Sequence, residues 1–218
     1  LDERIDRRSE HLAGYQNQSL AARYRALVEQ ARSAEEAAMP GVVELTEAVA
    51  KGYHKLLAIK DEYEVARLLT DPVFEDRLAR DFQPGGVTRF HLAPPLLARL
   101  DPATGRPRKI SFGPWLKPFL RSLAGLKGLR NTTLDPFGYS AERRAERSLI
   151  SQYEDDVARL LANLTPGNHA IAVALAQLPQ EIRGFGPVKE QAMQRAAERR
   201  GELLAAFAAP PEQAQAAQ

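Results

Sequence analysis

The stretch that decides the fold covers residues 140–178 and reads SAERRAERSLISQYEDDVARLLANLTPGNHAIAVALAQL. Its first part repeats apolar residues close to the 3.6-residue period of an α-helix, and Ser140 is the expected N-cap. The breakers at residues 165–168, TPGN, end this helix. The next segment, 170–178, is apolar nearly all round, which is typical of a buried helix. The stretch therefore predicts two consecutive helices that belong to a helical core.

The N-terminal residues 1–38 continue the helical period, with Gly14 as their only breaker. We expect a long amphipathic helix that is broken near residues 16–19. Asn17 or Ser19 could cap its second part, because each offers a side-chain oxygen to the free amides of a first turn.

Two more helices are expected before residue 83. The period over residues 43–70 predicts one helix, on which Lys60 and Glu64 form a solvated pair. Asp71 and Pro72 then predict the N-cap and first residue of a short helix that ends near Phe82. The acidic clusters at residues 61–64 and 154–156 are expected on solvated helix faces.

The period changes after the breakers QPGG at residues 83–86. Residues 87–93 and 108–112 indicate extended strands, and the turn-forming sequence DPATGRP at 101–107 lies between them. Two strands alone are marginally stable, so we expect this ribbon to pack on helices or on a partner. Further helices are predicted over residues 115–126 and 188–207, which frame the stretch that decides the fold.

The predicted fold class is mainly α, a helical domain with a small two-stranded β-ribbon packed on the helices. Residues 1–38 are predicted as a helical segment that leaves an upstream domain. Residues 39–208 are predicted as a C-terminal helical domain with its ribbon near 87–112. Residues 209–218 have too little apolar surface to offset the entropy of ordering them, so a disordered tail is expected.

Composition excludes several classes of function. The chain of 218 residues has a net charge of +2 and no cysteine, so it cannot hold an iron–sulfur cluster or a thiolate zinc site by itself. Its four histidines are scattered without metal-ligand spacing. No apolar run is long enough to span a bilayer, and a cytoplasmic location is expected. Because the sequence begins at Leu1 without an initiator Met, we expect a piece of a longer polypeptide.

The candidate site residues form two groups. The loop Arg183, Gly184, Phe185 and Gly186 lacks a phosphate-binding motif, so it is interpreted either as a tight turn or as an interface loop. His91 lies on the predicted ribbon, where a structural role is favoured over metal binding, and we include it among the candidate interface residues.

The second group is basic. Seven basic and no acidic residues occur between Pro102 and Leu134, and among them Arg106, Arg108 and Lys109 are candidate interface residues. The alternatives are docking on an acidic partner, ordinary solvated charge and, less favoured, nucleic acid. The interleaved aromatic residues have a spacing more typical of a core. They are Phe112, Trp115 and Phe119.

Four strings, in order, resemble one known family. They are YHKLLAIKDEYEVARLLTDP (residues 53–72), RFHLAPPLLARLDPATGRPRKISFGPW (89–115), LKGLRNTTLDPFGYSAERRAERSLI (126–150) and EIRGFGPVKE (181–190). The chain resembles, over residues 1–207, the C-terminal region of bacterial indolepyruvate ferredoxin oxidoreductases of the fused, single-chain kind.

The resemblance implies a parent enzyme that uses thiamine pyrophosphate, magnesium and iron–sulfur clusters. Such an enzyme oxidatively decarboxylates aryl or other 2-oxoacids, reduces ferredoxin and transfers the acyl group to coenzyme A. The implied partners are the upstream domains, a second protomer, ferredoxin and coenzyme A, with no membrane. No catalytic, cofactor-binding or metal residue of the family matches a position here, so this chain alone is expected to be non-catalytic.

Overall fold

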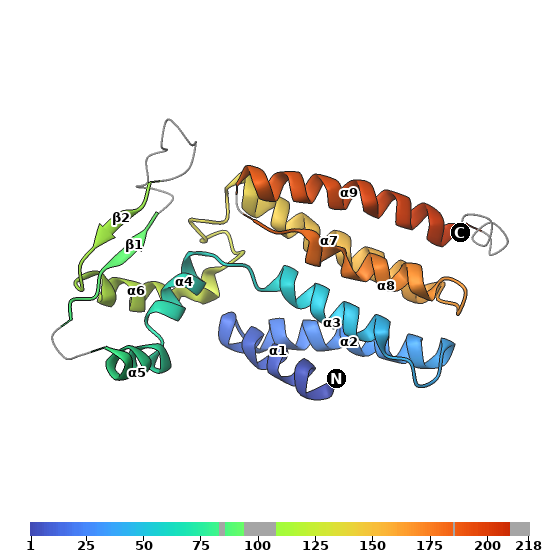
Figure 1. Cartoon of the computed structure of the whole chain (residues 1–218), viewed down its shortest axis with the longest axis horizontal. Helices are drawn as coiled ribbons and strands as arrows, with labels where there is room; N and C mark the ends of the chain where they lie inside the picture. The colour runs from blue at the N-terminus through green and yellow to red at the C-terminus, as the bar shows by residue number, and fades with distance from the viewer. Residues whose placement is uncertain (83–85, 94–107, 185, 210–218) are drawn as a thin grey trace. The chain divides into compact units, whose positions relative to one another are not determined.

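The computed structural model describes residues 1–82, 86–93, 108–184 and 186–209 (Figure 1). Helices dominate this part of the chain, and its only sheet is a two-stranded antiparallel one. The predicted mainly α fold with a small β-ribbon is confirmed. The chain forms two compact units. Unit 1 comprises Leu1–Ala58 and Ser140–Gln218, and unit 2 comprises Ile59–Tyr139.

Unit 1 is built from long helices that run roughly side by side in Figure 1. They are α1 (Asp2–Tyr15), α2 (Gln18–Ala38), α3 (Glu44–Leu57), α7 (Ala141–Ala162), α8 (His169–Gln177), the short 3-10 helix η2 (Leu178–Glu181) and α9 (Pro187–Ala208). Within the described residues, no helix is both long enough and apolar enough to cross a membrane.

The predicted helix starts in unit 1 are confirmed by their caps. Asn17 accepts a hydrogen bond from the Leu20 amide at 2.9 Å, so α2 begins where the break was expected. Ser140 accepts one from the Arg143 amide at 3.2 Å and caps α7. Each bond satisfies an amide that lacks a partner inside its own helix.

Three tyrosines lie at the centre of unit 1. The rings of Tyr24, Tyr53 and Tyr153 are stacked, with centroid distances of 6.2 and 5.9 Å. The Tyr153 hydroxyl donates to the Ala176 carbonyl at 2.9 Å. Gly52 makes this packing possible, because a Cβ there would lie 2.5 Å from that carbonyl oxygen and 2.7 Å from the Tyr153 hydroxyl. The glycine that weakens α3 as a helix therefore lets α8 approach it closely.

A buried carboxylate fixes the start of α3. Glu35 on α2 is fully buried and accepts hydrogen bonds from the amides of Leu45 and Thr46 and from the Thr46 hydroxyl, at 2.6–2.8 Å. His169 on α8 contacts the same carboxylate at 2.7 Å. Burial alone would raise the pKa of Glu35, but the hydrogen bonds outweigh it and hold the pKa below its usual value.

Unit 2 is smaller. Its elements are α4 (Glu62–Leu69), α5 (Pro72–Asp81), β1 (Phe90–Leu92), β2 (Ile110–Phe112), α6 (Leu116–Gly125) and the 3-10 helix η1 (Leu126–Leu129). In the hairpin, Phe90 pairs with Phe112 and His91 with Ser111. Phe90 packs with Ala66, Leu116 and Leu120, so the ribbon lies on helices, as predicted. The predicted turn at residues 101–107 lies outside the described residues.

The prediction of one continuous helix over residues 43–70 is wrong. The structure has two helices there, because α3 ends at Leu57 and α4 begins at Glu62. Asp61 caps α4 by accepting from the Glu64 amide at 2.8 Å, and it also binds the buried Arg130, whose Nη2 lies 2.9 Å from its Oδ1. Glu64 is buried and binds Arg67 rather than Lys60. The expectation that residues 61–64 form a solvated face is therefore also wrong.

The domain boundaries differ from the predicted ranges. The sequence predicts a separate segment over residues 1–38 and one domain over 39–208. In the structure, α1 and α2 share the core of unit 1 with α3, through buried residues such as Leu12, Tyr24 and Val49. The middle of the predicted domain forms unit 2. Residues 210–218 of the predicted tail lie outside the described residues.

Candidate functional site

The predicted interface loop, residues 183–186, follows the short helix η2 of unit 1 and connects it to α9. Gly184 and Gly186 have φ angles of +98° and +54°, in the region that favours glycine. A Cβ on Gly184 would also lie 2.7 Å from Val188 Cγ1. Arg183 is exposed, and its Nε donates to the Gln180 carbonyl at 2.9 Å. Phe185 lies outside the described residues. The glycines therefore supply a tight turn that presents Arg183 to solvent.

Cations gather around this loop. Lys51 and Lys55 lie one turn apart on α3, and the Lys51 carbonyl accepts from Gln180 Nε2 at 3.2 Å. Burial, together with repulsion from Arg183, Lys189 and Lys51, lowers the pKa of Lys55. Lys189 at the start of α9 forms ion pairs with Glu142 and Glu146. The loop thus belongs to a local basic cluster in unit 1.

The second predicted group lies in unit 2. His91 is exposed on β1, on the face of the ribbon opposite the buried Phe90. Arg108 and Lys109 are exposed just before β2, and Arg106 lies outside the described residues. The loop of unit 1 and these residues therefore belong to different units.

Part of the basic segment is neutralised within unit 2. Lys117 and Arg121 on α6 share the carboxylate of Glu75 on α5, at 2.8 and 3.3 Å. The Lys117 hydrogen bond lowers the pKa of Glu75. Arg130 is 3% exposed at its side chain and pairs with Asp61. The charge asymmetry in the sequence therefore overstates the uncompensated positive charge of unit 2.

The expectation that the interleaved aromatics belong to a core is wrong for two of the three. Trp115 is 69% exposed and Phe119 is 62% exposed, whereas Phe112 is half-buried. The buried face of α6 carries Leu116 and Leu120 instead. Trp115, the N-cap of α6, and Phe119 have a helical spacing, but both side chains are exposed. Periodicity alone does not tell which side of a helix faces the core.

Exposed large apolar side chains are concentrated in unit 2. Among the thirteen in the described residues, only Val43 and Val188 belong to unit 1. The other eleven are Leu68, Val73, Phe74, Phe82, Val87, Ile110, Trp115, Phe119, Leu126, Leu134 and Tyr139. Helix α5 buries none of its residues. Single exposed apolar residues need no explanation, whereas contiguous apolar patches are typical of surfaces that contact another molecule.

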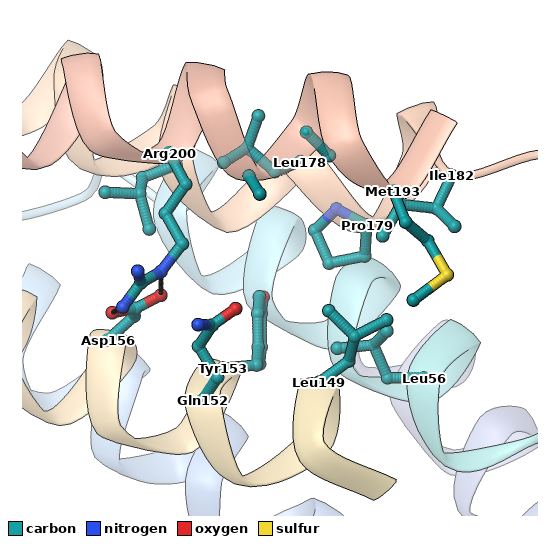
Figure 2. Close-up of a pocket in the computed structure, with 13 residues that line it drawn as sticks. Leu56, Leu149, Gln152, Tyr153, Asp156, Leu178, Pro179, Ile182, Met193 and Arg200 are labelled. Atoms are coloured by element: carbon teal, nitrogen blue, oxygen red, sulfur yellow. Dashed lines mark hydrogen bonds and ion pairs between the residues drawn. The ribbon is translucent and has the colours of Figure 1, made fainter. Parts of the chain in front are cut away.

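One cavity of unit 1 is a small gap between helices. Its volume is about 50 Å³, which accommodates about one or two waters. Figure 2 shows Asp156 and Arg200 facing each other at one end and Leu149, Met193 and Leu56 at the other. Arg200 binds both carboxylate oxygens of Asp156, at 2.5 and 2.6 Å. Asp156 is thus buried in an ion pair that joins α9 to α7, and not on a solvated face as predicted.

One polar contact was not apparent from the sequence. His11 Nδ1 and His54 Nε2 are 3.1 Å apart, although 43 positions separate them along the chain. Burial, with repulsion from His11 and Arg8, lowers the pKa of His54 to about 4. The described residues contain no group of three or more His, Cys, Asp or Glu placed to hold a metal ion. The pair is therefore a hydrogen-bonded contact between α1 and α3.

These observations define a class: a helical protein of two units, one with a deep core and one with an apolar and basic surface. The chain belongs to a family described as a family of unknown function (DUF6537), whose sequence profile matches residues 1–202. Neither a curated protein nor a solved structure matches the chain.

Proposed function

We propose that the chain is an interaction domain of a larger cytoplasmic enzyme, an indolepyruvate ferredoxin oxidoreductase that decarboxylates aryl or other 2-oxoacids oxidatively. In this proposal the chain contributes contacts to the enzyme and leaves the chemistry to other domains. The parent reaction rests on the sequence resemblance carried by the four strings. The role as an interaction domain rests on the surface of unit 2.

The observation that carries the role is the concentration of exposed apolar residues in unit 2. Eleven large apolar side chains of this unit face solvent, and α5 has no buried residue. Exposure of this kind has a free-energy cost in water that contact with another protein removes. A second protomer or the other domains of the parent would supply such a contact.

The iron–sulfur clusters of the parent do not fit this chain. A cysteine-ligated iron–sulfur cluster needs thiolates, and the sequence has no cysteine. Thiamine diphosphate is held through a divalent cation with oxygen ligands. The proposal assigns the clusters to other parts of the parent, and it places thiamine diphosphate and magnesium there as well because the resemblance carries none of the family's cofactor-binding residues onto this chain.

The proposal is tested by comparing the isolated chain with the longest open reading frame that encodes it. The isolated chain should bind no thiamine diphosphate in calorimetry and should not oxidise indolepyruvate. The longer polypeptide should reduce a redox dye in the presence of indolepyruvate and coenzyme A. Dye reduction by the isolated chain, or none by the longer polypeptide with any aryl 2-oxoacid, would contradict the proposal.

A further inference from the structure

Two cations of the basic cluster in unit 1 have no carboxylate partner among the described residues. Lys55 is half-buried in the last turn of α3, and Arg183 is exposed on the loop that leads into α9. Neither side chain forms an ion pair with a described residue. An ammonium group that is partly removed from water without an opposite charge costs free energy, and an anion from solution would offset that cost.

The other two cations of the cluster have acidic neighbours. Lys189 on α9 forms ion pairs with Glu142 and Glu146 of α7. Lys51 on α3 lines a groove that Glu47 and Glu181 also line. Only the first two cations therefore carry a charge that a ligand would be the first to neutralise.

The electrostatic surroundings of Lys55 are positive. After burial, repulsion from Arg183 is the largest cause that lowers the pKa of Lys55, followed by repulsion from Lys189 and Lys51. The groups that shift this pKa include no carboxylate. An anion placed within about 4–6 Å of the ammonium would act in the opposite direction, because it favours the charged form.

Hydrogen bonds hold Arg183 beside the end of α3. Its Nε donates to the Gln180 carbonyl at 2.9 Å, and Gln180 Nε2 in turn donates to the Lys51 carbonyl at 3.2 Å. The guanidinium is thus fixed through Nε, while its two Nη atoms form no hydrogen bond to the described residues. Two such donors in one plane match the spacing of two oxygens of a phosphate group.

The start of α9 adds backbone donors. The helix begins at Pro187 without a side-chain cap, so the amides of Val188 and Lys189 have no partner within the helix. Gly184 lies against this turn, because a Cβ there would lie 2.7 Å from Val188 Cγ1 and 3.5 Å from the Lys189 amide nitrogen. A helix N-terminus favours an anion through its amides and its dipole. It does not define a site by itself, but here it follows directly on the loop that carries Arg183.

We propose that Lys55 and Arg183 bind the phosphate group of a small soluble molecule, with the start of α9 as a further donor. The inference does not depend on the proposed function. A phosphate fits better than a carboxylate, because its additional oxygens reach an ammonium, a guanidinium and a backbone amide at once. Nucleic acid fits less well, since it needs a longer track of cations than this site offers. The bound phosphate joins the end of α3 to the start of α9.

The experiment titrates the chain of 218 residues with inorganic phosphate in a calorimeter, at constant ionic strength, and repeats the titration with acetate. The site variants are Lys55→Gln and Arg183→Gln. The matched controls are Lys60→Gln and Arg195→Gln, which remove the same charges at other exposed positions. Circular dichroism checks that each variant is folded. We expect each site variant to weaken phosphate binding by about tenfold, because it removes a charge-assisted hydrogen bond, and the controls to keep the affinity of the unaltered chain.

A second measurement follows the titration of the Lys55 side chain by nuclear magnetic resonance. Saturating phosphate should raise the pKa of Lys55, and acetate at the same ionic strength should raise it less. The inference is overturned if the unaltered chain binds no phosphate, if acetate binds as tightly, or if the controls lose as much affinity as the site variants. Binding to vesicles that contain phosphatidic acid, without binding to free phosphate, would overturn the assignment to a small soluble ligand.

Discussion

The two units of this chain stabilise themselves in different ways. Unit 1 buries 21 residues in one cluster with three stacked tyrosines, whereas the cluster of unit 2 contains four buried residues. Unit 2 also contains a buried ion pair between Arg130 and Asp61. It also exposes eleven of the thirteen large apolar side chains found exposed in the described residues. The difference teaches that unit 1 holds the main apolar core, whereas unit 2 leaves most of its large apolar side chains in solvent, which is the basis for proposing unit 2 as the contact surface.

The largest loss of stability is expected from a substitution at the centre of unit 1. Tyr153→Ala removes a buried ring that stacks on Tyr53 and should lower the free energy of unfolding by about 3–5 kcal/mol. Urea denaturation measures the change. Tyr153→Phe is the matched control, because it removes only the hydroxyl bond to Ala176 and should cost about 1 kcal/mol. Equal costs for the two variants would refute a packing role for the ring.

A loss of stability of similar size is expected from the buried ion pair of unit 2. Arg130→Ala leaves the carboxylate of Asp61 buried without its guanidinium partner, which typically costs about 3 kcal/mol or more. Hydrogen exchange should show faster exchange of amides in α4, while amides of α3 and α8 keep their protection. The comparison of the two units fails if exchange in unit 1 rises as much as in unit 2.

The histidine contact of unit 1 predicts a dependence on pH. His54 has a pKa of about 4 in the folded protein and an ordinary value near 6.5 when unfolded. Between these values the unfolded chain binds a proton that the folded protein does not, so stability should fall as the pH drops from about 6.5 to 4. Because His54 is only partly buried, we expect a loss of about 1–2 kcal/mol.

Denaturation of the unaltered protein and of His54→Gln across this pH range measures the effect. The variant should lose less stability on acidification, since glutamine does not titrate. His91→Gln, the same substitution at an exposed position of unit 2, is the matched control. If stability falls equally with pH in His54→Gln and in the unaltered protein, His54 is not the cause of the pH dependence.

The smallest change in stability is expected from a substitution on the exposed side of α6 in unit 2. Phe119→Ser should change the free energy of unfolding by about 0.5 kcal/mol or less, because the side chain is already in water. The neighbouring Leu120→Ala should cost about 2 kcal/mol or more, since Leu120 is buried. Urea denaturation of the two variants thus compares the two sides of α6 directly. A larger loss for Phe119→Ser would show that this side also packs in the folded chain.

Local signals predicted much of the fold. The caps Asn17, Asp71 and Ser140 and the change of period after residue 86 are short-range features, and the structure confirms the elements they predict. The break between α3 and α4 was missed because apolar spacing continues through it. Asp61 carried a capping signal there, but it was interpreted as part of a solvated face.

The exposed aromatic residues of the candidate site were harder to predict from the sequence, because their exposure depends on which side of α6 packs against the core of unit 2. Trp115 and Phe119 have the same spacing as core residues, and only the packing of Leu116 and Leu120 decides that they face outward. Likewise, the contact of His11 with His54 joins residues 43 positions apart. Contacts between residues so far apart in the sequence arise from tertiary packing, which the periodicity of apolar residues does not predict.

The most direct test of the account is hydroxyl-radical footprinting of the chain alone and within the longer polypeptide. Trp115 is the only tryptophan of the chain, and Val188 in unit 1 serves as an exposed reference. We predict that Val73, Phe74 and Trp115 of unit 2 lose reactivity in the longer polypeptide, whereas Val188 keeps it. Unit 2 side chains that stay as reactive in the longer polypeptide as in the isolated chain would contradict the proposal that this unit is a contact surface.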